Sequence, residues 1–487
     1  MDPSGSLNEK FAARYWNDPV AWVNNCIIHT KGGPAAYQED VLSRVSIEKR
    51  VSVRGPHGLG KSTLMAWAVL WFATTRDSLG VDWKVLTLAS VWRQLEKYLW
   101  PEIHKWARRL NWVEIGREPF TDRELLQLSL RLKTGEAFAV ASDNPESIEG
   151  AHADYILYVF DEAKIIPDAT WNSAEGAFSS GSETYWLAAS TPGEPLGRFY
   201  QIQTKVRGYS DWWARHVTLD EAVQAGRISK DWAEARRIQW GENSAAYKNR
   251  VLGEFAESSS DGVIPLAWVE KAIDRWYDLQ KKGSPKRLSA FAVDVGRGGD
   301  PSTIAPRYEM FIPTIFRSDT SDTMHLVGEI ISHVGSRDIP IVIDIIGLGA
   351  GVYDRLNEQK YNVISFIANE STLWESRSGN FRFSDTRSAA WWNARELLDP
   401  FSGPGLALPP DDEDLLIGDL TGPTWKYMSD GKIKVESKDV LRTRLGRSTD
   451  YGDVIIMSLW AEGSSRQVTW EDLVGLSHVE GYVSRWA

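Results

Sequence analysis

One stretch decides the fold of the first half of this chain: Arg54-Gly55-Pro56-His57-Gly58-Leu59-Gly60-Lys61-Ser62-Thr63. It matches the phosphate-binding loop pattern G-x-x-x-x-G-K-[ST] at every required position. A β-branched run at Val51 and Val53 precedes it, and an apolar run with helical spacing follows from Leu64 to Phe72. The order strand, glycine loop, helix therefore predicts an α/β fold of the P-loop type with a nucleotide site.

Each residue type in this loop suits a polyphosphate. The glycines allow backbone N–H groups to curl around the phosphates, and the helix N-terminus that follows adds its partial positive charge. Lys61 would reach the β- and γ-phosphates, and the Ser62 hydroxyl would ligate Mg²⁺. The alternative is a chance glycine turn, which the flanking strand and helix disfavour. The predicted nucleotide-binding residues of the loop are Gly55, Gly58, Gly60, Lys61, Ser62 and Thr63.

An acidic pair about a hundred residues later indicates that the predicted nucleotide site also hydrolyses ATP. Tyr155–Phe160 has the pattern of a buried strand, and Asp161 and Glu162 follow it directly. Acids at the carboxyl end of such a strand point into the ligand crevice, where Asp161 would hold Mg²⁺ and Glu162 would polarise the attacking water. The alternative is a solvated pair of carboxylates. A third strand, 184–189, ends in Ser190-Thr191-Pro192, which either senses the γ-phosphate or forms a plain turn.

Composition sets the class of protein. With 487 residues, 43% apolar and 25% charged, the chain is globular and long enough for two or three domains. Its one cysteine, Cys26, excludes an intrachain disulfide framework and suits a reducing cytoplasm. No apolar run reaches membrane-spanning length, so no membrane association is expected. Tryptophans at helical spacings are expected in the core rather than as base-stacking platforms: Trp67, Trp71, Trp92, Trp100 and Trp106.

The charge balance bears on nucleic acids. A net charge of −11 argues against a uniformly basic protein that coats DNA. Local basic clusters could still line a groove, although each could equally be a solvated helix face. These clusters are Arg108-Arg109, Arg236-Arg237, Lys281-Lys282 with Lys286-Arg287, and Arg442 with Arg444 and Arg447.

The chain is predicted to divide near residue 260. Up to 257, apolar strands alternate with helical stretches, as in a mostly parallel α/β sheet, which gives a P-loop ATPase domain over 1–257. Small polar residues at 257–262 then break the pattern, so 258–287 is expected to be a linker and a connecting helix. A second α/β domain is expected over 288–465, followed by a loosely ordered tail over 466–487.

The second half carries acids at the ends of its elements. Strand-like segments end in Asp294 and Asp344, and Asp453 lies at the start of the apolar helical segment 454–460. Three acids so placed could converge on two divalent cations that activate water for phosphodiester cleavage. Hard oxygen ligands favour Mg²⁺ or Mn²⁺ over zinc. Unrelated strand-end and cap carboxylates are an equal alternative from spacing alone.

Two other patterns in this half need separate interpretations. The glycine run Gly347-x-Gly349-x-Gly351 invites a dinucleotide-binding hypothesis, but the third glycine of that fingerprint is missing. Asp300 and Asp450 lie close in sequence to the three acids, and we expect them to tune a metal site rather than to form it.

Taken together and in this order, the motifs resemble the large terminase subunits of tailed bacteriophages. Pro34-Ala35-Ala36-Tyr37-Gln38 resembles the adenine-recognition motif of that family, which implies that Gln38 contacts the base. Arg54 resembles the arginine that opens its variant phosphate loop, and Ser190-Thr191-Pro192 resembles its coupling motif. The segment from Tyr247 to Pro265 looks like the one that joins its two domains.

The resemblance implies a ribonuclease-H-like fold for the second domain, with Asp294, Asp344 and Asp453 on its three acidic motifs. It implies a motor that uses ATP and Mg²⁺ to move double-stranded DNA into a procapsid, and a metal-dependent endonuclease that cuts concatemeric DNA. The implied partners are DNA, a small terminase subunit and a portal ring on which the chain forms a ring of copies. The implied location is the host cytoplasm during assembly, and not the mature virion.

Two alternatives stay open beside this interpretation. A helicase or repair ATPase fused to a nuclease is one, although a second motor domain is not evident. A nucleotide-gated assembly protein with an inactive nuclease fold is the other, and intact acids disfavour it. One departure from the family also matters, because Glu149 stands where relatives carry an arginine that acts on a neighbouring subunit's nucleotide. Arg54 is one substitute, and Arg117, Arg123 or Arg131 are others.

Overall fold

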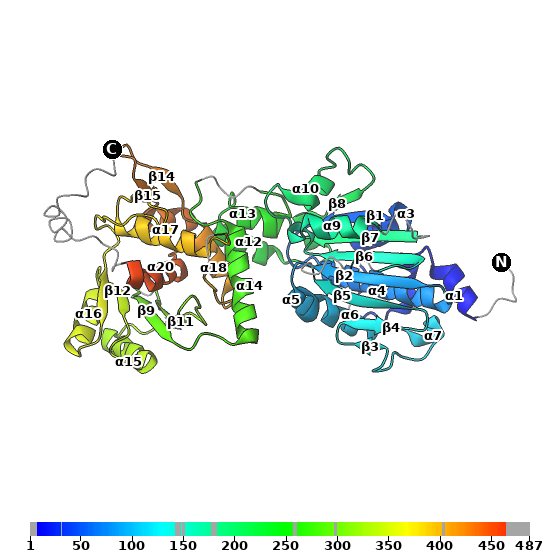
Figure 1. The fold of residues 1–487 in the computed structure, drawn as a ribbon, viewed down its shortest axis with the longest axis horizontal. Helices are drawn as coiled ribbons and strands as arrows, with labels where there is room; N and C mark the ends of the chain where they lie inside the picture. Colours follow the sequence, from blue (N-terminus) through cyan, green and yellow to red (C-terminus); the bar gives the residue numbers. More distant parts are fainter. Residues whose placement is uncertain are drawn as a thin grey trace, which may run out of the picture. The chain divides into compact units, whose positions relative to one another are not determined.

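A computed structural model describes residues 7–30, 32–141, 148, 151–176, 183–256, 261–296, 300–401 and 405–463. The chain forms two compact units (Figure 1). The first comprises Met1–Glu234 and Tyr247–Glu257, and the second comprises Ala235–Ala246 and Ser258–Ala487. The sequence did not indicate that the short segment Ala235–Ala246 packs with the second unit. Glu149, residues 258–260 at the start of the predicted linker and the tail over 466–487 lie outside the described residues.

The described part of the first unit is built on one eight-stranded sheet in the order β3-β4-β5-β2-β6-β7-β1-β8. Its neighbours from β5 to β8 are parallel, as predicted, while β3 and β4 form an antiparallel edge. The strands are β1 (Arg50–Arg54), β2 (Trp83–Ala89), β3 (Leu125–Leu126), β4 (Ser129–Arg131), β5 (Gly135–Ala141), β6 (Tyr155–Asp161), β7 (Glu183–Ser190) and β8 (Trp213–His216).

Helix α4 (Lys61–Ser78) forms the centre of this unit. Every residue from Leu64 to Arg76 is buried, because the helix packs against the sheet on one side and against other helices on the other. Of the tryptophans expected in the core, four are buried, but Trp92 is 44% exposed. The other α-helices in the described ranges up to residue 257 are α1 (Leu7–Tyr15), α2 (Pro19–Cys26), α3 (Ala36–Glu48), α5 (Trp92–Gln94), α6 (Trp100–Ala107), α7 (Trp112–Ile115), α9 (Asp168–Glu175), α10 (Gly197–Gln203), α11 (Leu219–Gln224), α12 (Lys230–Trp240) and α13 (Ala245–Tyr247). Other helical turns are π-helical at Leu95–Leu99 and Lys248–Leu252, and 3₁₀ at Ala163–Ile165.

The described part of the second unit contains a five-stranded sheet in the order β11-β10-β9-β12-β13. The first three strands along the chain run antiparallel, and the last two run parallel to β9. This order and direction are those of a ribonuclease-H-type fold, which confirms the predicted class. The strands are β9 (Leu288–Asp294), β10 (Ser302–Tyr308), β11 (Phe316–Ser318), β12 (Ile341–Asp344) and β13 (Val363–Phe366), and a separate hairpin consists of β14 (Trp425–Tyr427) and β15 (Ile433–Val435).

Helices surround the second sheet and position its acids. The predicted helical segment near the end of the chain is α20 (Asp450–Gly463), which packs on β9, β10 and α17. Because β9 and β12 are parallel neighbours, their last residues, Asp294 and Asp344, lie at the same edge of the sheet. The helices are α14 (Leu266–Lys282), α15 (Thr323–Val334), α16 (Gly349–Glu358), α17 (Thr386–Leu398), α18 (Glu413–Thr421), α19 (Lys438–Leu445) and α20. None of the helices in the described ranges is long and apolar enough to span a membrane.

Candidate nucleotide and metal sites

The phosphate-binding loop connects β1 to α4, as predicted. Gly58 and Gly60 have φ of +80° and +83°, a conformation that residues with side chains rarely adopt. A Cβ on Gly55 would lie 2.9 Å from the carbonyl oxygen of Val217 and 2.7 Å from the Leu59 side chain. The loop backbone therefore depends on glycine at these three positions.

The three residues that open α4 have different surroundings. The Lys61 ammonium donates to the carbonyl of Pro56 at 2.9 Å, so the side chain folds over the loop. Burial lowers the pKa of Lys61, and the charges of Glu162 and Asp161 oppose this effect. Ser62 is half-buried at the first turn of the helix. The Thr63 hydroxyl instead donates to Glu102 on α6 at 2.6 Å, a contact that holds two helices together and that the sequence analysis did not expect.

The acidic pair lies at the end of β6, where it was predicted. Asp161 is buried, and this burial together with the adjacent Glu162 raises its pKa to about 7, while Lys61 acts in the opposite direction. Glu162 has φ of +47°. Its Oε2 accepts hydrogen bonds from the hydroxyls of Ser190 at 2.9 Å and Thr191 at 3.3 Å. The predicted sensor hydroxyls therefore contact the predicted general base itself.

The predicted base-recognition residue Gln38 is fully buried on α3. Its Oε1 accepts from the backbone N–H of Ala35 at 2.9 Å and from the Arg227 guanidinium at 3.0 Å. Because both neighbours are donors, the orientation of the amide is fixed with its NH₂ group on the other side. A Cβ on Gly60 would lie 3.3 Å from that nitrogen, so Gln38 packs directly behind the phosphate loop.

Arg54 ends β1 immediately before the loop. Its guanidinium lies 5.0 Å from the centre of the Phe255 ring, and burial lowers its pKa while the charge of Glu254 acts to raise it. Its Nε has no hydrogen-bond partner in the described part of the chain. Arg54 therefore lies at the loop as a partly buried cation, the position that the expected role requires.

Residues near the end of the first unit contact both nucleotide loops. Gly253 has φ of +69°, and a Cβ there would lie 2.7 Å from the Cα of Gly55. The Asn249 side chain donates to the carbonyl of Gly193, which follows the Ser190-Thr191-Pro192 motif, at 2.9 Å. The sequence had assigned this segment only as a connection between domains.

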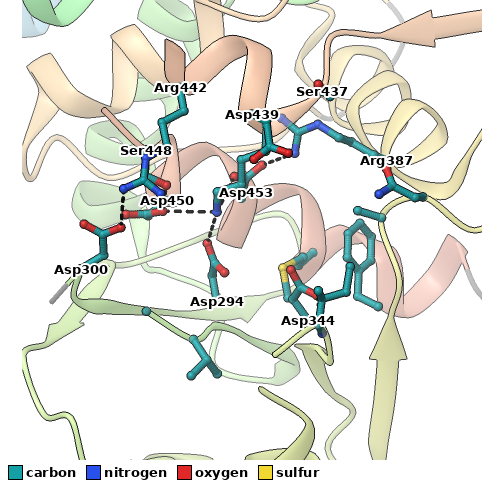
Figure 2. Close-up of a pocket in the computed structure, with 18 residues that line it drawn as sticks. Asp294, Asp300, Asp344, Arg387, Ser437, Asp439, Arg442, Ser448, Asp450 and Asp453 are labelled. Atoms are coloured by element: carbon teal, nitrogen blue, oxygen red, sulfur yellow. Dashed lines mark hydrogen bonds and ion pairs between the residues drawn. The ribbon is translucent and has the colours of Figure 1, made fainter. Parts of the chain in front are cut away.

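The three predicted nuclease acids line one cavity of about 230 Å³ in the second unit (Figure 2). Asp294 comes from β9, Asp344 from β12 and Asp453 from α20, and the first and last are more than nine-tenths buried. Elements far apart in the sequence therefore bring carboxylates to one place, as the motif order predicted.

A lysine that the sequence analysis missed lies among these acids. The Lys438 ammonium, at the start of α19, is 2.8 Å from Asp294, 3.0 Å from Asp453 and 3.3 Å from Asp450. In Figure 2, dashed lines that end on the labelled Asp294 and Asp450 mark two of these ion pairs. Burial acts to lower the pKa of Lys438, but the charges of the three aspartates outweigh it and raise the pKa.

A second cation holds Asp453 from the opposite side. Arg387 on α17 donates to Asp453 at 2.6 Å and to the carbonyl of Glu436 at 3.2 Å. Burial opposes ionisation of Asp453, but Arg387 and Lys438 overcome this effect and lower its pKa. Asp294 is shifted the other way, because burial raises its pKa more than Lys438 lowers it. No local motif marked Arg387 as part of the site.

Asp344 and the two neighbouring acids complete the cavity. Asp344 accepts a hydrogen bond from the backbone N–H of Ile346 at 2.9 Å. Asp300 pairs with Arg442 at 3.2 Å, whereas Asp450 belongs to the group around Lys438. Within the described ranges, no three acidic, histidine or cysteine side chains are arranged as a ready metal cage. The donor set fits Mg²⁺ or Mn²⁺ by chemistry, since it consists of hard carboxylate oxygens, two of them on buried residues and the third on the half-buried Asp344.

Several of the basic residues considered for a DNA groove are paired with acids. Arg442 pairs with Asp300, Arg444 with Glu436, Arg447 with Asp419, Arg236 with Asp414 and Arg237 with Glu242. These five side chains therefore already have anionic partners within the protein. For these five residues, the structure favours the interpretation as charged side chains on helix surfaces over the interpretation as a DNA-binding groove.

A P-loop unit with an acidic pair at a strand end, followed in the chain by a ribonuclease-H-type unit with an acid-lined cavity, is typical of proteins that act on nucleotides and phosphodiesters. No protein-family model matches the chain. A curated relative, the probable terminase, large subunit, of Enterobacteria phage P7, is 22% identical over 459 residues, which cover 86% of this chain and 89% of the relative. The resemblance to large terminase subunits that the motifs indicated is therefore confirmed along most of the chain.

Two solved structures are similar to one unit each. The nuclease domain of the large terminase subunit of bacterial virus Sf6 is 19% identical, with a TM-score of 0.34, over 40% of this chain and 97% of that domain. The large terminase ATPase domain of Thermus phage P74-26 is 19% identical, with a TM-score of 0.37, over 46% of this chain and 94% of that domain.

Proposed function

We propose that this chain is the large subunit of a viral DNA-packaging terminase. It couples ATP hydrolysis to translocation of double-stranded DNA into a procapsid, and it cuts concatemeric DNA with a metal-dependent endonuclease. The observation that carries the proposal is the combination of two sites in one chain. One is a complete phosphate loop with the acidic pair of Asp161 and Glu162, and the other is the cavity lined by Asp294, Asp344 and Asp453. The relative over most of the chain supports the same function.

In the first unit, each residue has a role that its position allows. The loop N–H groups and Lys61 hold the phosphates, and Glu162 takes the proton of the attacking water. The hydroxyls of Ser190 and Thr191 orient the Glu162 carboxylate. Ser62 and Asp161 would hold Mg²⁺, which neutralises phosphate charge when bound. Gln38 and Arg54 are assigned to the base and the phosphates by family likeness.

In the second unit, the acids form the cutting site. Asp294, Asp344 and Asp453 would hold Mg²⁺ or Mn²⁺, which supplies an activated water and stabilises the leaving oxygen when bound. Arg387 keeps Asp453 ionised and fixed in direction. Lys438 offsets the negative charge of Asp294 and Asp453, which its ammonium contacts at 2.8 and 3.0 Å. Manganese in a structure of the Sf6 nuclease domain agrees with this choice of ions.

The partners follow from the proposed task. A packaging motor must accept any sequence, so DNA would be held mainly through its phosphates. A small terminase subunit would choose the site to be cut, and a portal ring would hold a ring of copies of this chain. The chain would act in the host cytoplasm and be absent from the mature virion.

Two assays separate this function from its alternatives. Purified protein with Mn²⁺ should cut supercoiled plasmid, and the Asp294→Ala variant should not, while both hydrolyse ATP. ATP hydrolysis with an intact plasmid at every metal concentration would favour the assembly protein with an inactive nuclease. ATP-driven separation of the strands of a short duplex, without movement along intact duplex DNA, would favour a helicase or repair ATPase.

A further inference from the structure

The first turn of α20, which carries Asp450 and Asp453, is capped by a side chain from another helix. The first N–H groups of a helix have no partner within it and need an outside acceptor. Here the N–H groups of Tyr451 and Gly452 donate to Oδ2 of Asp419 at 2.9 and 3.2 Å. Asp419 lies on α18, more than thirty residues earlier in the chain.

Asp419 is itself held rigidly. Its side chain is fully buried, and its second oxygen accepts from the Arg447 guanidinium. Arg447 also donates to the carbonyls of Ser448 at 2.8 Å and Gln239 at 3.4 Å. A buried ion pair of this kind adds little net stability, since the desolvation of both charges offsets their attraction. Its clearest structural consequence is therefore the position of the two backbone N–H groups.

The fit between α18 and α20 leaves no room for a side chain at Gly452. A Cβ there would lie 2.9 Å from the Trp391 ring and 3.1 Å from the Cβ of Asp419. The Tyr451 hydroxyl donates to Asp412, which directly precedes α18, so a second contact joins the same elements. The capped residues are the two that lie between Asp450 and Asp453.

We propose that Asp419 is a positioning residue of the nuclease site, which fixes the first turn of α20 so that Asp450 and Asp453 face the cavity. The inference rests on the proposed nuclease function. Asp419 does not line the cavity and touches no reacting atom; it acts through the backbone of Tyr451 and Gly452. Losing such a support typically lowers metal affinity about 10–100-fold.

The test measures Mn²⁺ binding by calorimetry on the full chain, with cleavage and thermal unfolding in parallel. Asp419→Asn should raise the Kd for Mn²⁺ at the nuclease site about 10–100-fold. The Asp294→Ala variant identifies the heat that comes from other sites. Tyr451→Phe is the matched control, because it removes the hydrogen bond to Asp412 but keeps both backbone hydrogen bonds to Asp419. The Kd of this variant for Mn²⁺ should stay within about twofold of the wild-type value.

A second variant covers the case in which Asp419→Asn does not fold. Gly452→Ala keeps every carboxylate but forces α20 away from Asp419, and it should weaken Mn²⁺ binding in the same way. Folded protein of either variant with wild-type Mn²⁺ affinity, even with a lower unfolding temperature, would overturn the proposal. Because binding is measured apart from cleavage, a wild-type chain that binds Mn²⁺ but cuts no DNA would refute the nuclease function and not the role of Asp419.

Discussion

The ammonium of Lys438 lies 2.8 Å from the carboxylate of Asp294, in the cavity where a divalent cation is proposed to bind. A monovalent cation thus neutralises acids that would otherwise repel one another at close range. A divalent ion that binds these acids must compete with this ammonium. Lys438 is therefore placed to set the metal affinity of the site as well as its charge.

Lys438→Met should tighten Mn²⁺ binding several-fold, because the acids lose the cation with which the metal competes. Calorimetric titration of the full chain measures the change. The control is Arg442→Met, which removes a cation that pairs with Asp300 in the lining of the same cavity. Unchanged or weaker Mn²⁺ binding in Lys438→Met would show that the ammonium supports the metal ligands rather than competes for them.

The cavity acids should be individually essential for cutting. Asp294→Ala, Asp344→Ala and Asp453→Asn should each abolish plasmid cleavage in Mn²⁺, because two divalent cations stay together only when shared carboxylates neutralise them. ATP hydrolysis should survive in all three. Asp300→Ala should keep measurable cleavage, since Asp300 pairs with Arg442 instead of Lys438. Equal loss in Asp300→Ala and Asp294→Ala would move the metal site towards Asp300.

Lys61→Ala should abolish ATP hydrolysis and packaging and leave plasmid cleavage intact. The prediction rests on the position of Lys61 in the loop, where it is surrounded by the charges of Asp161 and Glu162, and on its distance in the chain from the nuclease acids. Steady-state phosphate release and plasmid cleavage are measured on the same preparation. ATPase turnover near the wild-type rate would refute the assignment of the loop.

Glu162→Gln should bind nucleotide normally and hydrolyse it about 10²–10⁴-fold more slowly, the usual effect of losing a general base. Ser190→Ala should have a smaller effect, since the Thr191 hydroxyl still donates to Glu162. Binding of a fluorescent ATP analogue and single-turnover hydrolysis separate the two steps. Equal weakening of nucleotide binding in Asp161→Asn and Glu162→Gln, with no loss in the chemical step, would remove Glu162 as the base.

The sequence predicted the features that short motifs encode. The phosphate loop, the strand before Asp161 and the acids Asp294, Asp344 and Asp453 all lie within such motifs, and the structure places them at the expected ends of strands and helices. Lys438 is 144 residues from Asp294, so only the tertiary fold, which places the start of α19 beside the end of β9, brings the two together. Its one local signal, a lysine at the start of a short helix, is too common to be informative.

Contacts between side chains on different helices also could not be predicted from the motifs. Thr63 was predicted to bind the nucleotide, but its hydroxyl donates to Glu102 on α6, a residue that no loop motif includes. Asp419 caps α20 from another helix, and no spacing rule connects two such positions. The sequence motifs therefore predicted the candidate reacting groups. The residues that hold those groups in place could not be predicted, because their roles depend on tertiary contacts.

Gly253→Ala should impair the ATPase although Gly253 belongs to no nucleotide-binding motif. The residue has φ of +69°, and a Cβ would lie 2.7 to 2.9 Å from backbone atoms of Gly55 and Pro56, which cannot move without distorting the phosphate loop. The nearby hydrogen bond from His57 N–H to the carbonyl of Arg250, at 2.8 Å, would be strained by the same shift. We expect weaker ATP binding and slower hydrolysis, with plasmid cleavage unchanged. Gly226→Ala is the control, because Gly226 also has a positive φ, +66°, but an added Cβ there meets no atom within 4 Å. Equal ATPase activity in the two variants would show that the contact between Gly253 and the loop has no role in nucleotide binding.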